Sequence, residues 1–184
     1  MGTFFSNHWY NRNSWGESMK KRLILYAGKY KTTKECAQLL ADKFYEHVKL
    51  CSIADVQSVS LQDYDQIIFG ASIYESRISR KMSQWIKKHQ NHLLHKEIGI
   101  FLCAYHDEKC GLYMKLNFPI EILEHAKVEM CFGAHLDYST MSWLDRFLMK
   151  LIQFFDQEEI VTKVYKERIH YFAREMAKGE EIYE

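Results

Sequence analysis

The residues best suited to chemistry lie in and beside a short polar loop, Ala27–Thr32. The loop leaves an apolar run of strand length, Leu23–Tyr26, and enters an amphipathic helix that Thr33 can cap. Free backbone N–H groups and the positive end of the helix dipole point into such a loop, so it can bind an anion. We expect it to hold a phosphate group; an ordinary strand-to-helix turn is the alternative. The candidate phosphate-binding residues are Gly28, Lys29, Lys31, Thr32 and Thr33.

Three histidines, His89, His92 and His95, have a spacing that resembles a metal-binding cluster. Steps of three residues drift around the axis of a helix, so these side chains do not converge on one point. No cysteine or acidic ligand completes a set with them. We therefore expect a solvated helix end and no metal site. No nucleophile or acid–base pair indicates hydrolysis, and the sequence assigns no catalytic residue.

Strands and helices alternate along the chain and must position these residues. Alternation of this kind predicts parallel βα units with right-handed crossovers and helices on both faces of one sheet. The expected strands are Leu23–Tyr26, Val48–Ser52, Tyr64–Gly70, Ile98–Cys103 and Val128–Gly133. Further helices are expected at Ser79–Leu94, Pro119–Lys127, Trp143–Phe155 and Val161–Lys178.

Three loops follow strands at the edge of the sheet where ligands bind. In open α/β sheets that edge is formed by the carboxyl ends of the strands, at the point where strand order reverses. The loops are Ala27–Thr32, Ala71–Arg77 and Ala104–Gly111. Their placement follows from the alternating pattern, whereas the order of the strands does not.

The composition is that of one globular domain. The chain has 184 residues, 47% of them hydrophobic and 27% charged, and no linker rich in proline, glycine or serine divides it. A net charge of +1 gives no basic surplus for binding nucleic acid. Five scattered cysteines without a CxxC pair indicate buried, reduced thiols in a cytoplasmic protein. No apolar run is long enough to span a membrane.

The first eighteen residues differ from the rest of the chain. They are rich in asparagine and serine, lack periodicity, and precede a methionine, Met19, that stands directly before the first strand. We expect residues 1–18 to form a disordered extension and residues 19–184 to form the domain.

Three longer stretches resemble a family of bacterial flavoenzymes. They are Gly70–His89, Phe132–Ile152 and Phe172–Ala177, within a similarity that runs from Lys21 to Lys178. They resemble the menaquinone-dependent protoporphyrinogen oxidases, which are flavodoxin-like. The resemblance implies a three-layer flavodoxin-like α/β domain with a five-stranded parallel sheet and FMN as cofactor. It also implies oxidation of protoporphyrinogen, a step of haem biosynthesis, with a quinone as electron acceptor.

The resemblance also gives roles to the second and third loops, which would cover the flavin ring. A flavin is a flat apolar plate with polar edges, so aromatic side chains suit its faces and backbone groups suit its edge. Tyr74 is the stacking candidate, with a half-exposed loop aromatic as the alternative. His106 can relay protons, with a surface histidine as the alternative. The candidate flavin contacts are Ala71, Ser72, Ile73, Tyr74, Tyr105 and His106.

Two differences from the family's pattern leave other functions open. Ala27-Gly28 and Lys31 stand where the family's phosphate loop has a hydroxyl residue and a glycine, and the segment before the last strand lacks a long basic insertion. One alternative is a flavodoxin electron carrier, although such carriers are usually strongly acidic. The other is a non-enzymatic interaction domain with a degenerate FMN site.

The expected helix Trp143–Phe155 has an unusually wide apolar arc. Such a helix either packs into the core or rests on a membrane surface, where a lipid-soluble quinone is reached. In the second case, we expect a cytoplasmic protein that also contacts the inner face of the cell membrane peripherally.

Overall fold

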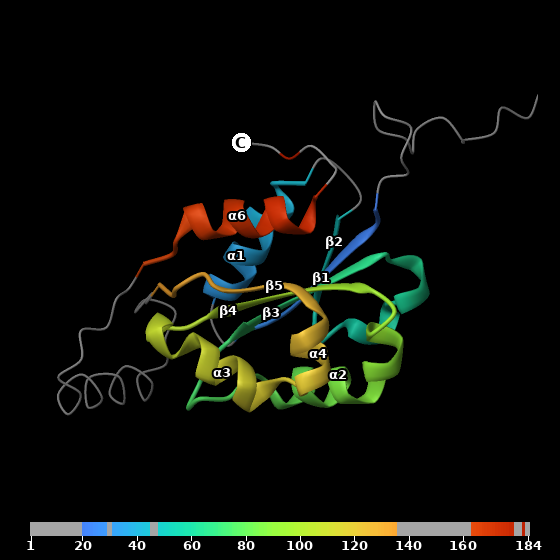
Figure 1. Ribbon diagram of the computed structural model, residues 1–184, viewed down its shortest axis with the longest axis horizontal. Coiled ribbons are helices and arrows are strands. Elements are labelled where there is room, and N and C mark those ends of the chain that lie inside the picture. Colours follow the sequence, from blue (N-terminus) through green and yellow to red (C-terminus); the bar gives the residue numbers. More distant parts are fainter. Residues whose placement is uncertain (1–19, 29–30, 45–47, 136–162, 179–181, 183–184) are drawn as a thin grey trace, which may run out of the picture.

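A parallel sheet forms the centre of the computed structural model, which describes residues 20–28, 31–44, 48–135, 163–178 and 182 (Figure 1). Its strands are β1 (Arg22–Ala27), β2 (Val48–Ser52), β3 (Gln66–Ser72), β4 (Glu97–Cys103) and β5 (Ala126–Cys131). Neighbouring strands follow the order β2-β1-β3-β4-β5, and every pair runs parallel. The expected five-stranded parallel sheet is confirmed.

Burial explains the contrast between the strand sequences. β1, β3 and β4 lie inside the sheet and are buried along almost their whole length, which accounts for their continuous apolar runs. β2 and β5 are edge strands in which buried positions are interrupted by exposed ones. The hydrophobic pattern therefore marks the interior strands more strongly than the edges.

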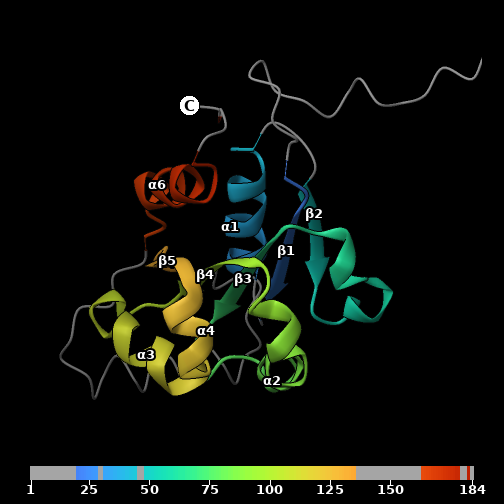
Figure 2. The ribbon, with the colours of Figure 1, turned by 45° about the vertical axis from the view of Figure 1, so that its right-hand side comes forward.

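Helices cover both faces of the sheet, which gives the three layers (Figure 2). On one face, α1 (Lys31–Ala41) and α6 (Lys166–Met176) pack around Phe101, Phe132 and Phe172. The Phe101 and Phe132 rings stack with centroids 4.6 Å apart, and Phe172 meets Phe132 edge-on at 5.4 Å. On the other face lie α2 (Arg80–Leu93), α3 (Cys110–Asn117) and α4 (Ile120–His125).

A polar network closes the sheet at the amino ends of its strands. The buried guanidinium of Arg22 donates to Gln66 Oε1 at 2.7 Å, and Gln66 Nε2 donates to Glu97 Oε2 at 2.6 Å. Lys20 and Lys127 form ion pairs with the Glu97 carboxylate at 2.7 and 3.0 Å. Burial by itself raises the pKa of Glu97, but hydrogen bonds from Lys20, Lys127 and Gln66 outweigh it and hold that pKa at about 2.

Several boundaries differ from the sequence expectation. The first helix begins at Lys31, so Thr33 lies inside the helix and does not cap it. Pairing of β3 with β4 continues to Ser72, which places Ala71 and Ser72 in a strand and not in a loop. The last helix begins at Lys166, because Val164 instead forms a bridge with Gly133.

One helix, α3, was not expected at all. It lies where the third loop was predicted to end, and its buried residues Tyr113, Met114 and Asn117 face the core. Two further expectations, the helix Trp143–Phe155 and the extension 1–18, lie outside the described residues.

Candidate functional site

A cleft of about 530 Å³ opens at the carboxyl ends of β1, β2 and β3. The chain passes from β1 outward to β2 and then back to β3 on the other side, so the strand order reverses here. Gly28 from the first loop, Ser72 from β3 and Tyr74 from the second loop all line this cleft. Three of the predicted site residues, far apart in sequence, are thus brought to one wall.

The second loop is a tight hairpin that holds Tyr74 at the cleft. The N–H of Tyr74 donates to the carbonyl of Arg77, and the N–H of Arg77 donates back, both at 2.9 Å. The two central residues, Glu75 and Ser76, have positive φ angles of 47° and 61°. This turn geometry usually requires asparagine or glycine, because a side chain there costs roughly 1–2 kcal/mol per residue.

Contacts from α3 hold this strained turn in place. Asn117 Nδ2 donates to the carbonyl of Ser76 at 2.9 Å, and Asn117 Oδ1 accepts the N–H of Ile78 at 2.9 Å. Arg77 Nη1 donates to the carbonyl of Leu116 at 3.1 Å. Backbone strain that persists only because its surroundings enforce it is typical of ligand-binding loops.

The predicted phosphate loop reaches the cleft through its backbone. Gly28 is exposed at the cleft wall, whereas the Thr32 hydroxyl donates to the carbonyl of His135 at 2.9 Å. Thr33 is 1% exposed, and its hydroxyl lies beside the Cys103 sulfur without a hydrogen bond of good geometry. Lys31 is exposed at the start of α1, and Lys29 lies outside the described residues.

This arrangement fits a phosphate held by main-chain groups. The first N–H groups of α1 have no acceptor within the helix, and they point toward the same edge of the sheet as Gly28. A threonine hydroxyl that is already bonded to a carbonyl is not needed for such binding. Among the described side chains, the Thr33 hydroxyl is the one buried nitrogen or oxygen group without a hydrogen-bond partner. A further donor or acceptor beside it would satisfy it.

The other predicted flavin contacts are not on the cleft wall. Ala71 is fully buried in the core, and the N–H of Ile73 donates to the carbonyl of Cys103 at 3.1 Å. Tyr105 and His106 are partly buried and belong to the loop after β4, on the far side of β3 from the cleft. The structure therefore separates the three loops into two groups: the first two meet at the cleft, and the third does not line it.

Several residues that line the cleft were not predicted from the sequence. Ser52 and Ile53 at the end of β2, and Tyr26 at the end of β1, contribute to the wall. The only sequence signal for Ser52 and Ile53 was their position at the end of an expected strand. That position predicts a cleft contact only when the strand is known to lie beside β1, and the sequence did not provide the strand order. Ser79, the residue before α2, also lines the cleft and makes no side-chain capping bond to its helix.

Two of the three histidines, His89 in α2 and His95 just beyond its end, make separate local contacts. The His89 ring lies against the Trp85 ring, with centroids 4.6 Å apart and ring planes tilted by 38°, and His95 Nδ1 lies 2.7 Å from the carbonyl of Asn91. Burial, together with Lys88 and His92, lowers the pKa of His89. Within residues 20–28, 31–44, 48–135, 163–178 and 182, no group of three or more potential ligands could hold a metal ion.

The strand order defines a doubly wound α/β fold, and the cleft lies at the carboxyl ends of the paired strands β1 and β3, where the order of the strands along the chain reverses. Residues 23–160 match the family model described as flavodoxin domain, and the chain belongs to this family.

Comparisons with individual proteins agree with this class. The chain is 28% identical to the protoporphyrinogen IX dehydrogenase (quinone) of Escherichia coli strain K12, over 85% of this chain and 94% of that protein. Its fold is similar to that of a Fusobacterium nucleatum flavodoxin bound to flavin mononucleotide, with a TM-score of 0.54, 13% identity, and coverage of 89% and 100%. A short-chain flavodoxin associated with a bacterial microcompartment gives a TM-score of 0.55 at 15% identity, with coverage of 88% and 99%. The expectations of a flavodoxin-like fold and of FMN as the cofactor of this class agree with these findings.

Proposed function

We propose that this protein binds FMN in the cleft at the carboxyl ends of β1 and β3 and acts as an FMN-dependent oxidoreductase. The observation that carries the proposal is the convergence of Gly28, Ser72 and Tyr74 on one cleft at the reversal of strand order. A cleft of about 530 Å³ is within the size range of cofactor sites.

Each part of the cleft has a role in this proposal. The main chain at Gly28 and the first turn of α1 bind the phosphate, with Lys31 adding positive charge. Tyr74, which is 43% exposed, covers one face of the ring, and Ser72 offers polar groups to its edge. Contact of Tyr105 and His106 with the second face of the flavin ring remains a prediction. When bound, FMN supplies the redox chemistry, while the protein positions the ring and excludes water.

The finer proposal is oxidation of a porphyrinogen with a quinone as the electron acceptor. It is supported by the similarity to the Escherichia coli dehydrogenase, which covers almost the whole of both chains. In the described residues, no helix has the length and apolar character needed to cross a membrane. We also propose that a lipid-soluble quinone is reached by peripheral contact with the membrane, with Trp143–Phe155 as the contacting segment of a cytoplasmic protein.

An electron carrier without its own substrate is the second candidate, since two flavodoxins share the fold with TM-scores above 0.5. Charge favours the enzyme, because a carrier that docks on basic partners needs an acidic surface and this chain has a net charge of +1.

Anaerobic mixing with protoporphyrinogen and a menaquinone analogue separates these functions. Turnover supports the oxidase, and reduction only by a flavodoxin reductase supports the carrier. A colourless protein that does not take up added FMN contradicts both and supports the non-enzymatic domain.

A further inference from the structure

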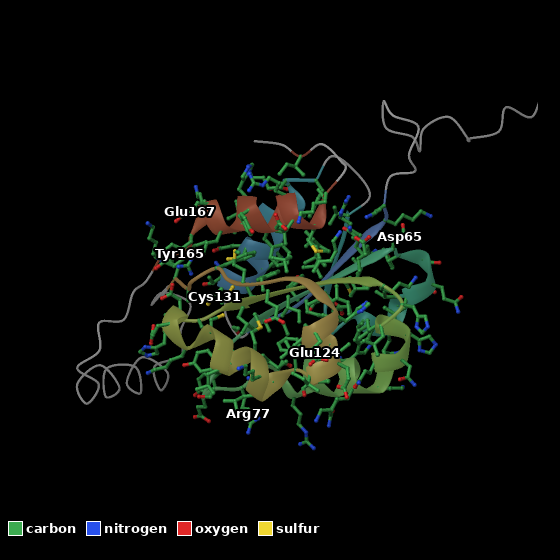
Figure 3. All side chains as sticks on the ribbon, viewed as in Figure 1. Asp65, Arg77, Glu124, Cys131, Tyr165 and Glu167 are labelled. Carbon is green, nitrogen blue, oxygen red and sulfur yellow. The ribbon has the colours of Figure 1, made fainter. Side chains whose placement is uncertain are left out.

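A second hollow lies beside α2. It is a groove of about 800 Å³ between this helix and the segment 56–62, which connects β2 to β3. Figure 3 shows the side chains of this region on the right of the view, on the opposite side from the labelled Tyr165. The groove shares no lining residue with the cleft, and none of the predicted site residues lines it.

One wall of the groove comes from a single face of α2. Lys81, Trp85 and Lys88 follow one another at steps of four and three residues, so the helix places them side by side. His89 and His92 continue the same row. The wall therefore presents two ammonium groups with an indole ring between them.

The opposite wall is uncharged. Val59 and Leu61 are partly buried, pack against the core and line the groove. Gln57 and Gln62 add neutral polar groups beside them. None of the described residues that line the groove is an aspartate or a glutamate. The groove thus combines apolar surface with positive charge and suits an anion that carries a large apolar body.

The aromatic part of the helix wall is held in place before any ligand binds. The Trp85 ring meets the ring of Phe69 in β3 edge-on, with centroids 6.2 Å apart, and the His89 ring lies 4.6 Å away from it. Burial, followed by Lys88 and His92, lowers the pKa of His89, so its ring is uncharged at neutral pH. A ligand that packs on this surface therefore does not have to order it, which favours binding.

The groove borders the proposed FMN site at Lys81. Lys81 lines the groove, and its Nζ donates at 2.8 Å to the carbonyl of Ala54, which lines the cleft. Ser79, two residues before Lys81, also lines the cleft. An ammonium group has three donors, so the bond to Ala54 leaves Lys81 able to bind an anion. A molecule held in the groove at Lys81 lies next to the wall of the cleft.

We propose that this groove binds the organic substrate of the enzyme, an amphipathic molecule whose carboxylates pair with Lys81 and Lys88 and whose apolar ring system packs on Trp85. The inference rests on the proposed function, because it gives a binding site to the substrate that the flavin oxidises. The volume of the groove is within the range of small-molecule sites. A porphyrinogen with two carboxylates on an apolar macrocycle has the chemistry that these walls require.

Titration of the full-length protein with protoporphyrin IX, with and without added FMN, tests the proposal. This probe is a stable oxidised form of the ring that keeps both carboxylates, and the anisotropy of its own fluorescence reports binding. We expect one site per chain. Lys88→Glu should weaken binding at least about tenfold, because it puts a repelling charge where a carboxylate binds. Lys87→Glu is the matched control, since Lys87 is exposed on the same helix but does not line the groove, and its affinity should stay within about twofold of the wild type.

Gln84→Glu is a second variant that changes charge with almost no change of shape. Gln84 is exposed and lines the groove, so the substitution leaves the core untouched and should still weaken porphyrin binding by about threefold or more. The FMN affinity of all three variants, measured by flavin fluorescence, should match that of the wild type, because none of these residues lines the cleft.

Three outcomes would overturn the proposal. They are a wild-type protein that does not bind protoporphyrin IX, equal porphyrin affinities of the Lys87→Glu and Lys88→Glu variants, and a Gln84→Glu variant that binds as tightly as the wild type. The proposed function has a separate readout. A protein that does not bind FMN contradicts the assignment of the cleft, whereas porphyrin binding that is insensitive to Lys88 in a protein that binds FMN contradicts the groove alone.

Discussion

The side chain of Asn117 donates a hydrogen bond to the carbonyl of Ser76 at 2.9 Å and so joins α3 to the turn beside the cleft. Asn117 is 8% exposed and also accepts the N–H of Ile78. One buried carboxamide therefore bonds both to the strained hairpin that carries Tyr74, at Ser76, and to the chain that leaves it, at Ile78.

Replacement of Asn117 by alanine should destabilise the protein and loosen this hairpin. The buried N–H of Ile78 would lose its acceptor, which costs about 1–3 kcal/mol of unfolding free energy. Urea denaturation measures the loss, and FMN titration should show weaker binding. Asn91→Ala, at an exposed position of α2, is the matched control and should change neither. Unchanged stability of Asn117→Ala would show that the contact does not hold the turn.

The positive φ of Ser76 predicts that glycine is favoured there. Ser76→Gly removes the side-chain penalty but keeps the carbonyl that Asn117 binds, so we expect a gain of about 0.5–1 kcal/mol in unfolding free energy. Ser76→Val should have the opposite effect, since a β-branched side chain tolerates this backbone conformation poorly. If the two variants have the same stability by thermal denaturation, the turn does not have this geometry in solution.

Tyr74 is expected to stack on the flavin. Tyr74→Ala should weaken FMN binding by about tenfold, whereas Tyr74→Phe should retain it, because the ring provides the contact. Tyr171 is a matched control, since it is 44% exposed against 43% for Tyr74 and lies on α6. Fluorescence titration with FMN measures all of them. Equal losses for Tyr74→Ala and Tyr171→Ala would place the flavin elsewhere.

Glu97 should make the stability depend on pH in the acid range. Its pKa in the folded protein is about 2, below its ordinary value of 4.5. Its contribution is therefore complete above pH 4.5 and is lost as the pH falls through about 2. The carboxylate is 36% exposed, so solvent screening reduces this contribution to about 1 kcal/mol.

Glu97→Gln tests this pH dependence by urea denaturation across the acid range. The variant should be less stable than the wild type at pH 7 and indistinguishable from it near pH 2. Glu124→Gln, on the exposed side of α4, serves as control and should match the wild type throughout. A stability difference for Glu97→Gln that does not change with pH would contradict the assigned pKa.

The sequence predicted the parts of the fold that depend on local patterns. Residues 67–70 of β3 are apolar because this strand is buried on both faces, and this can be recognised without knowing its neighbours. The helix start near Thr33 was misplaced, because tertiary packing decides where α1 begins. Helix α3 was missed for a similar reason, since the partners of Asn117 lie about 40 residues away.

The site was predictable only in part, because the order of the strands determines which further residues line the cleft. Gly28 and Tyr74 follow strands that are adjacent in the sheet, so their loops meet. Ser52 joins them because β2 lies beside β1, which no local pattern reveals.

Thr33 offers a probe that separates cofactor binding from stability. Its hydroxyl is buried without a good hydrogen bond, so Thr33→Val should change the unfolding free energy by less than about 0.5 kcal/mol. Weaker FMN binding by this variant, measured by fluorescence titration, would assign the hydroxyl to the phosphate. Unchanged affinity would agree with binding by the main chain alone. A loss of stability above about 1 kcal/mol would show that the Cys103 contact is a real hydrogen bond.

Titration of the purified apoprotein with FMN and with riboflavin, followed by quenching of flavin fluorescence, tests the central claim most directly. A phosphate held at the start of α1 and a ring held beside Tyr74 predict one FMN per chain and at least tenfold weaker binding of riboflavin, which lacks the phosphate. No quenching by either flavin, or equal affinity for both, would contradict the assignment of this cleft to FMN.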